Sequence, residues 1–553
     1  MPDTLKEQLQ KELSQLKQDR SSFEPHWQDL SEWISPRSSR FLKSDVNRGD
    51  RRNTKIVDPT ATMANRTLAS GMMSGITSPT RPWFKLATPD PEMMDYGPVK
   101  MWLETVQNRM NDMFNKSNLY QSLPIMYGSL GTYGTSAMAV LEDNEDIIRT
   151  YPFPLGSFYI ANSPRLSVDT TYREFSMTVR QMVQMFGIDK VSTSVKGLWE
   201  TGAYETWIEV VQAVYPNLNR DTGKLDAKNK LYKSVYYEAG GDNDRVLRES
   251  GFDEFPILAP RWEVNGEDVY GSSCPGMLAL GQVKALQLEQ KRKSQLIDKA
   301  TNPPMVGPSS LKNQRVSLLP GAITYIDQMG SQDGFKPAYL VNPNTADLLA
   351  DIQDTRSIIN SAYFTDLFMM LQNVNTRSMP VEAVIEMKEE KLLMLGPVLE
   401  RLNDEFLDPL IDRSFSIMVK KNLLPQPPDV MQGMPLRIEY ISVMAQAQKA
   451  IGLGSLERFV GFVANMAQAK PEALDKLNVD QAIDSYAIMS GVSPTVVVPE
   501  EDVQATRQQR AQQQQQQQAM QMGMAAAQGA KTLSEAQTAD PSVLSAMAGV
   551  PQQ

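Results

Sequence analysis

The fold is decided by a stretch that begins GMLALGQVKALQLEQKRKSQLIDKATNPP (residues 276–304) and resumes TADLLADIQDTRSIINSAYF (residues 345–364). Apolar residues recur at helical spacing in both parts, as at Leu280, Val283 and Leu286. Pro303 and Pro304 end the first helix. At 1.5 Å per residue the helices rise about 37 and about 30 Å. Two helices of similar length around an insert predict an antiparallel pair with the insert at its tip.

The insert, residues 303–344, is rich in turn residues such as Gly307-Pro308 and Pro320-Gly321. A segment of this kind at the end of a helix pair predicts a compact knob on the surface, suited to docking a partner. The basic residues expected to dock it are Lys312, Arg315 and Lys336.

A loop is predicted at 365–379, after the second helix. It is apolar from Leu367 to Leu371 and polar afterwards, with Asn373, Asn375 and Arg377. This composition fits a connection packed into the core or, if the helices line a channel, a loop that projects into the channel.

A third helical run is predicted at 380–422, with Pro397 and Pro409 inside it. Each proline removes a backbone donor, so the helix should bend or restart there. Carboxylates recur four residues apart, at Glu382, Glu386 and Glu390 and again at Glu400, Asp404, Asp408 and Asp412. Like charges at this spacing destabilise an isolated helix by about 0.2–0.5 kcal/mol per pair. These acidic stripes are either a solvated face, a face that meets a neighbouring subunit's basic groups, or a surface that should not grip a polyanion.

The rest of the chain predicts an α+β protein. Helices are expected at 4–20, 58–75, 98–114 and 119–130, with a basic arm at 37–52 and a strand at 83–86. Residues 135–265 hold short segments rich in β-branched and aromatic residues, which predict a β-rich region with a helix at 178–186. After the boundary Pro425-Gln426-Pro427-Pro428, helices are expected at 442–449, 456–469 and 479–489. Residues 501–531, with glutamines throughout 512–518, predict one long helix or a disordered tail.

Composition excludes several classes of protein. The length of 553 residues predicts two to four domains. The chain has no run of 18 apolar residues, so no membrane span is predicted. A net charge of −10 disfavours tight DNA binding through phosphates. One cysteine, Cys274, and one histidine, His26, leave no Cys/His zinc cluster and no intramolecular disulfide. Residues 128–136 resemble a phosphate loop but lack its lysine, so we expect a helix-to-strand turn there. For the chain as a whole we expect no enzyme activity, no metal and no cofactor.

Short motifs along the chain carry a family resemblance. They are Arg81-Pro82-Trp83-Phe84, Tyr133-Gly134-Thr135-Ser136-Ala137, Pro260-Arg261-Trp262, Val269-Tyr270-Gly271-Ser272, and Glu389-Glu390-Lys391 through Leu395-Gly396-Pro397 to Glu405, Pro409 and Arg413. In this order, over about residues 5–498, the chain resembles the portal, or head-to-tail connector, proteins of short-tailed tailed phages.

The resemblance implies a virion protein at one capsid vertex, assembled in the host cytoplasm. It implies a ring, usually of twelve subunits, whose channel passes double-stranded DNA during packaging and ejection. The partners implied are terminase, tail adaptor proteins, and capsid or scaffold proteins, with no membrane. The portal fold places a wing at 1–272, stem helices at 273–302 and 345–364, a clip at 303–344, a tunnel loop at 365–379, a long kinked wing helix at 380–424, a crown at 425–500, and a barrel helix or disordered tail at 501–553.

The resemblance also assigns candidate residues. The tunnel-loop candidates for facing DNA are Phe368, Met369, Met370, Gln372, Asn373, Asn375 and Arg377. The basic residues of the first stem helix are Lys284, Lys291, Arg292, Lys293 and Lys299. They are expected to touch phosphates or to pair with a neighbour's acidic stripe at 400–412, and pairing is favoured because strong DNA contacts would stall transport.

Two alternatives remain at this point. One is another phage head-tail structural protein, such as an adaptor or a tail tube. The other is a metal-dependent nucleic-acid enzyme built on carboxylates, which nuclease or ATPase activity of the purified chain would reveal.

Overall fold

The structure is a computed structural model of the whole chain. It describes residues 4–41, 53–306 apart from 95, 225 and 242–244, 336–337, 345–372, 395–441 apart from 432 and 434–435, 453–470, 476–490, 498 and part of 503–524. The chain forms two compact units, Met1–Gln448 and Lys449–Gln553. The described parts combine helices and antiparallel sheets, in agreement with the expected α+β class.

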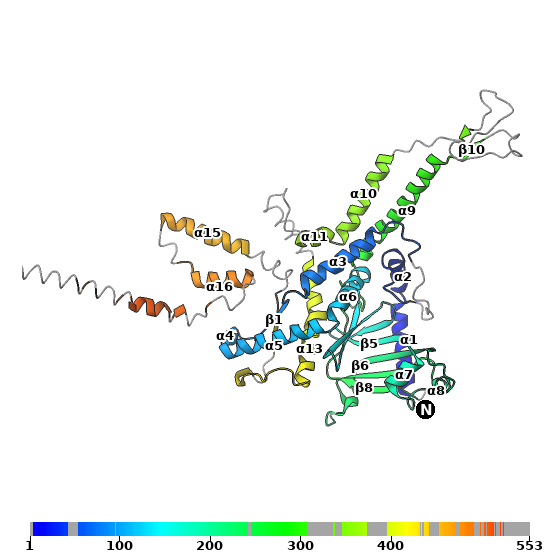
Figure 1. The fold of residues 1–553 in the computed structure, drawn as a ribbon, viewed down its shortest axis with the longest axis horizontal. Coiled ribbons are helices and arrows are strands. Elements are labelled where there is room, and N and C mark those ends of the chain that lie inside the picture. Colours follow the sequence, from blue (N-terminus) through cyan, green and yellow to red (C-terminus); the bar gives the residue numbers. More distant parts are fainter. Residues whose placement is uncertain are drawn as a thin grey trace, which may run out of the picture. The chain divides into compact units, whose positions relative to one another are not determined.

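A five-stranded antiparallel sheet lies next to the N-terminal helix (Figure 1). Its strands, in spatial order, are β4 (Phe158–Asn162), β5 (Val168–Thr178), β6 (Trp207–Pro216), β7 (Tyr232–Glu238) and β8 (Arg248–Phe252). Helix α1 (Leu5–Arg20) begins with a capping box between Thr4 and Glu7, and packs on one face through Leu9 and Leu13.

Alternation along the strands separates the two faces of this sheet. Val211 and Tyr237 pack with α1, whereas Val210 and Tyr236 pack with the helices α7 (Val179–Phe186) and α8 (Thr193–Glu200). The sheet is therefore covered on both faces.

The main core lies beside this sheet. It is built from α2 (Glu24–Trp33), α3 (Thr60–Ile76), α5 (Gly97–Lys116) and α6 (Leu119–Tyr133). The short helix α4 (Pro91–Met94) precedes α5. A three-stranded sheet joins β3 (Ile148–Phe153), β2 (Ala137–Glu142) and β9 (Ile257–Leu258). A separate ladder pairs β1 (Phe84–Ala87) with β12 (Arg437–Tyr440). One-turn helices η1 (Ala227–Asn229) and η4 (Asp429–Met431) lie in connections.

Helices α9 (Pro275–Thr301) and α10 (Thr345–Ala362) run side by side and extend beyond this core (Figure 1). A small antiparallel ladder of β10 (Met305–Val306) and β11 (Lys336–Pro337) follows the end of α9. The rest of the insert lies outside the described residues. The expected helix pair is thus present, and its first helix extends one residue beyond the expected range of 276–300 at each end.

Two later elements differ in detail from the expectations. The predicted loop at 365–379 begins with a helix, α11 (Thr365–Gln372), because its apolar run has a core face to pack on. The third run contains a helix over 395–402, a π-helical turn η3 (Asn403–Leu407), and α13 (Asp408–Lys420) with Pro409 in its first turn. The helix therefore continues through Pro409, with a π-helical turn just before the proline in place of the expected restart.

The second unit contains α15 (Leu453–Ala469) and α16 (Val479–Ser490), near the positions expected. Arg507 pairs with Asp480 at 2.6 Å, and residues 506–513 are helical. The described start of the glutamine-rich segment is therefore helix. The helix expected at 442–449 lies outside the described residues. No helix in the described ranges has the length and apolar character to cross a membrane.

Candidate functional site

The helix pair is fastened to the core by a buried carboxylate, Asp58. Arg356 of α10 donates to Asp58 Oδ2 from Nε and Nη2, at 3.1 and 2.7 Å, and Gln290 of α9 donates to the same oxygen at 3.1 Å. Gln287 of α9 accepts from the backbone N–H of Asp58 at 2.7 Å and donates to its carbonyl at 2.9 Å. Asp58 Oδ1 accepts from the N–H of Thr60 at 2.9 Å. One residue thus ties both long helices to the start of α3.

Asp58 stays ionised despite its burial. Burial opposes ionisation, but the hydrogen bonds from Thr60 and Arg356 outweigh it and hold the pKa of the carboxyl below its usual value. The ion pair with Arg356 therefore persists through neutral pH.

A second node joins distant parts of the sequence through Arg261, whose side chain is 2% exposed. Its Nη2 donates to Glu405 Oε1 at 2.7 Å, and its backbone N–H donates to Glu405 Oε2 at 2.9 Å. The same guanidinium donates to Asn162 Oδ1 at 3.1 Å and to the carbonyl of Leu166 at 2.8 Å. Arg401 also reaches Glu405, at 3.2 Å. The turn η3 is thereby held against the β region.

Three of the sequence motifs meet beside this node. Trp262 N–H donates to Gly134 O at 2.8 Å, and Gly271 N–H donates to Thr135 Oγ1 at 2.8 Å. Gly134 ends α6 with a φ of 76°. A Cβ on Gly271 would lie 2.1 Å from the carbonyl oxygen of Gly134. Residues 128–136 are thus a helix end and a turn into β2, as expected. Of their three glycines, Gly134 alone has a positive φ.

The start of α9 is seated on the end of α6. A Cβ on Gly276 would lie 2.3 Å from Thr132 O, so only glycine fits this approach. Cys274 donates its S–H to the same oxygen at 3.2 Å, and burial raises the pKa of its thiol to about 12. The single cysteine is a buried packing residue.

The expected stem residues differ in their surroundings. Lys284 already pairs with Asp29 of its own chain, at 2.7 Å. Lys291, Arg292 and Lys299 are exposed, and Lys293 is half-buried. None of these four has an ion-pair partner among the residues that the structure describes.

The expected tunnel-loop residues are divided. Phe368 is 1% exposed and packs against Gly71 of α3, where an added Cβ would lie 2.2 Å from the ring. Met369, beside it on α11, is 55% exposed. Met370 and Gln372 belong to α11, but their side chains lie outside the description, as do Asn373, Asn375 and Arg377 entirely. In this chain Phe368 is therefore a core residue and offers no free surface.

The second acidic stripe is on the described part of the third run. Glu400, Asp404 and Asp412 are exposed, while Asp408 is half-buried and accepts a hydrogen bond from Tyr440 of β12. Although Asp412 is exposed, the protein around its carboxyl removes part of its hydration and raises its pKa, and the neighbouring charges of Asp408 and Glu254 raise the pKa further. The stripe thus stores like-charge repulsion. The first stripe, at 382–390, lies outside the described residues.

The docking candidates of the insert are almost untested by the structure. Lys336 begins β11, opposite Val306 of β10. Lys312 and Arg315 lie outside the described residues.

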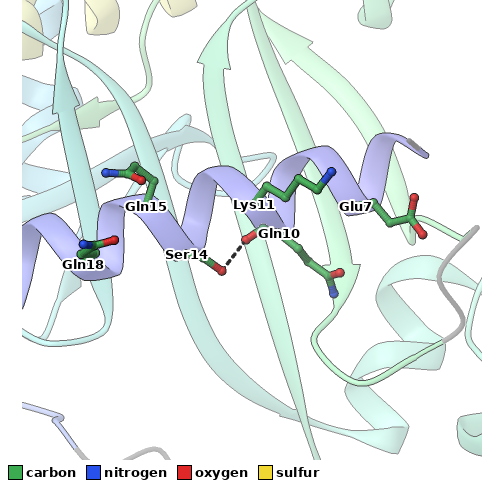
Figure 2. A pocket seen from close by; sticks show the side chains of 6 residues that line it. All are labelled: Glu7, Gln10, Lys11, Ser14, Gln15 and Gln18. Carbon is green, nitrogen blue, oxygen red and sulfur yellow. Dashed lines mark hydrogen bonds between the residues drawn. The ribbon is translucent and has the colours of Figure 1, made fainter. Parts of the chain in front are cut away.

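Other sites offer little chemistry. A shallow hollow of about 390 Å³ follows the outer face of α1, lined by Glu7, Gln10, Lys11, Ser14, Gln15 and Gln18 (Figure 2). All six side chains are polar and come from one helix, so we assign no ligand to it. His26 is exposed on α2. Within the described ranges, no three His, Cys, Asp or Glu side chains are grouped to hold a metal ion.

Comparison with known proteins decides the family. The family described as bacteriophage head to tail connecting protein matches residues 6–497. The chain belongs to this family. It is 77% identical, over the full length of both chains, to the portal protein of Salmonella phage epsilon15. It is 45% identical to the probable portal protein of Bordetella phage BPP-1, over 97% of this chain and 96% of that one. The resemblance to phage portal proteins is confirmed.

A solved structure shows a weaker likeness. A chain from a virion of native gene transfer agent particle aligns over 71% of this chain and 89% of its own, with a TM-score of 0.30 and 11% identity. This likeness is too weak to support a statement about the fold.

Proposed function

We propose that the chain is the subunit of a ring at one vertex of a phage capsid, through which double-stranded DNA enters during packaging and leaves at ejection. The observation that carries this proposal is the 77% identity to a portal protein over the full length of both chains. The ring would hold about twelve subunits, and it would contact capsid or scaffold proteins in the head and adaptor proteins in the tail.

The helix pair supports a division of labour within the subunit. Helices α9 and α10 would form the stem, because Asp58 and Gly276 fasten them rigidly to the core. The insert at 303–344 would form the clip, where terminase docks first and the tail adaptors dock later, through Lys312, Arg315 and Lys336. The region 1–272 and the third run, 380–424, would form the wing. Residues 425–500 would form the crown, and the tail at 501–553 would form the barrel.

Fewer residues are proposed to face DNA in the tunnel loop than were expected from the sequence. Phe368 would anchor the loop to α3 and the exposed Met369 would begin its free surface. Met370, Gln372, Asn373, Asn375 and Arg377 remain the candidates for DNA contact.

Weak DNA contact suits a channel. A protein that binds phosphates tightly releases counterions and holds its DNA in place. This chain has a net charge of −10 and an acidic stripe on its surface, so it would form few such contacts. We assign it no catalytic role, and the purified chain should show neither nuclease nor ATPase activity.

Electron microscopy of the purified chain tests the ring. We expect end-on views with about twelvefold symmetry and a central hole wide enough for duplex DNA. A compact closed particle without a hole would contradict the proposal and favour an enzyme or an adaptor.

A further inference from the structure

We infer that neighbouring copies of this chain bind each other through a basic face on α9 of one copy and an acidic face on α10 of the next. The inference rests on the proposed ring and names the contact that closes it. The α9 face consists of Leu288, Arg292, Gln295 and Lys299. The α10 face consists of Asp347, Asp351, Asp354 and Ile358.

Each face lies on one side of its helix. The positions follow one another at intervals of four, three and four residues in both helices, the spacing of a single helical stripe. All eight residues are exposed, including the apolar Leu288 at 47% and Ile358 at 43%. The two stripes carry opposite charge, and each includes one apolar residue.

Four charged side chains on these faces are not matched within the described part of one copy. Arg292, Lys299, Asp351 and Asp354 have no ion-pair partner in the described part of the chain. Glu289 of α9 faces Asp351, and burial together with the charge of Asp351 raises the pKa of Glu289. Asp351 and Asp354 of the acidic face thus lack, within the described residues, a cation that a second copy could supply.

The register of the helix pair places the two faces at corresponding heights. Glu289 interacts with Thr355 and Asp351, and Gln290 and Arg356 bind the same oxygen of Asp58. From this level the antiparallel helices set Leu288 near Ile358, Arg292 near Asp354, and Lys299 near Asp347, each to within about one turn.

A ring preserves these heights. Rotation about an axis along the helix pair leaves the height of every residue unchanged, so the α9 face of one copy would meet the α10 face of the next in register. The faces differ from each other, so such a contact joins copies head to tail rather than as a twofold dimer, and it closes into the proposed ring when the rotation between copies divides a full turn. This assigns the basic residues of α9 a partner on α10 instead of the acidic stripe at 400–412.

The contribution of each pair is small, but the set is repeated. Exposed ion pairs stabilise little individually. Several complementary charges along one face fix register and exclude wrong pairings. The apolar contact between Leu288 and Ile358 would add burial at the same height.

Charge reversal tests this contact with two full-length variants. The first is Arg292→Glu with Lys299→Glu, which gives both faces a net negative charge. The second is Asp351→Lys with Asp354→Lys, which gives both faces a net positive charge. Under conditions in which the unaltered chain forms rings, native mass spectrometry should show a fraction of chains in rings at least about tenfold lower for each variant alone. The reason is that like charges meet at every interface.

Mixing the two variants gives the decisive result. An acidic α9 of the first variant would face a basic α10 of the second, and the reverse holds at the next interface. An equimolar mixture should therefore recover rings in which the two variants alternate. Control variants carry matched reversals on exposed turns, Arg165→Glu with Arg220→Glu and Asp189→Lys with Glu267→Lys, and should assemble normally.

Two outcomes would overturn the inference. One is normal assembly of either variant alone, and the other is a mixture that fails to assemble although circular dichroism shows both variants folded. The proposed function fails separately, if the unaltered chain gives no ring in any condition.

Discussion

Asp58 determines whether the helix pair moves with the core or apart from it. Its carboxylate is bound by side chains from α9 and α10, and its backbone is held by Gln287. Removing its charge would leave the Arg356 guanidinium without its partner and would loosen both helices together.

We predict that Asp58→Asn speeds hydrogen exchange of the α10 amides by about 10- to 100-fold at neutral pH, since charged hydrogen bonds contribute about 1.5–3 kcal/mol. The pKa of Asp58 is lowered in the folded chain, so its stabilisation is present above the unfolded pKa and is lost as pH falls through the folded value. The difference between the two chains should therefore fade below about pH 4. Exchange mass spectrometry measures it.

The matched control is Asp354→Asn on the exposed side of α10, measured on unassembled chains. It should leave exchange unchanged. Equal acceleration by both substitutions would show that Asp58 has no special part in holding the helix.

Two glycines of α9 give a matched pair. Gly276→Ala brings a Cβ to 2.3 Å from Thr132 O and forces the helix start away from α6, whereas Gly281→Ala meets nothing within 4 Å. Alanine is the better helix former by about 1 kcal/mol. We expect Gly276→Ala to lower the thermal midpoint and Gly281→Ala to hold or raise it. The same change in both variants would contradict the close seat of α9 on α6.

At the scale of elements, α11 depends on one aromatic anchor. Phe368→Ala would leave a cavity against α3, which typically destabilises by about 3–5 kcal/mol. Met369→Ala changes an exposed side chain and should change stability little. Chemical denaturation compares the two. A larger effect of Met369→Ala would show that α11 faces the other way.

The acidic stripe gives a prediction that depends on assembly. Burial and neighbouring charges raise the pKa of Asp412, so its ionised form destabilises the fold above its folded pKa, and this cost vanishes below its unfolded pKa. In the unassembled chain Asp412→Asn should stabilise at pH 7 by about 0.2–0.5 kcal/mol, and not at pH 3.

In the ring, the effect of Asp412→Asn on assembly shows what the acidic stripe faces. If a neighbour's basic groups meet it, Asp412→Asn should weaken ring assembly while it stabilises the single chain. If the stripe is only solvated or faces DNA, assembly should be unchanged. Thermal midpoints at both pH values and native mass spectrometry of the rings separate these cases.

Helical periodicity and proline positions located the long helices from the sequence, because local spacing determines them. The pairing of β1 with β12 was not predictable, since its strands are about 350 residues apart and each has four residues. The pair Arg261–Glu405 was also missed as a pair, although both residues stood in quoted motifs. The helix over Leu367–Leu371 is not predictable from sequence, because a short apolar run does not reveal whether a core face lies beside it.

Two further segments show the limits of composition. The segment 256–264 is rich in strand formers, yet only Ile257 and Leu258 pair as a strand, because the next residues serve the Arg261 node. Helix α8 escaped notice although its Ser192 N-cap is present in the sequence. Among the site residues, the exposed fraction of the side chain shows that Phe368 is a core residue and Met369 a surface residue. Sequence alone does not distinguish the two.

At the scale of the whole molecule, the account describes a subunit made for repetition. A core carries two long helices fastened by buried polar contacts, and the exposed sides of these helices carry opposite charge. Within the described residues of a single chain, Arg292 and Lys299 of one face and Asp351 and Asp354 of the other have no ion-pair partner, and a ring would pair them at every interface.

An asymmetric cryo-electron microscopy reconstruction of the intact phage particle would show directly whether this chain forms a DNA channel at a single vertex. The account predicts density for this chain at one vertex only, as a ring of about twelve copies around a channel that contains DNA, with α9 and α10 of each copy beside the channel. Density for this chain along the tail alone, or at every vertex, would contradict it.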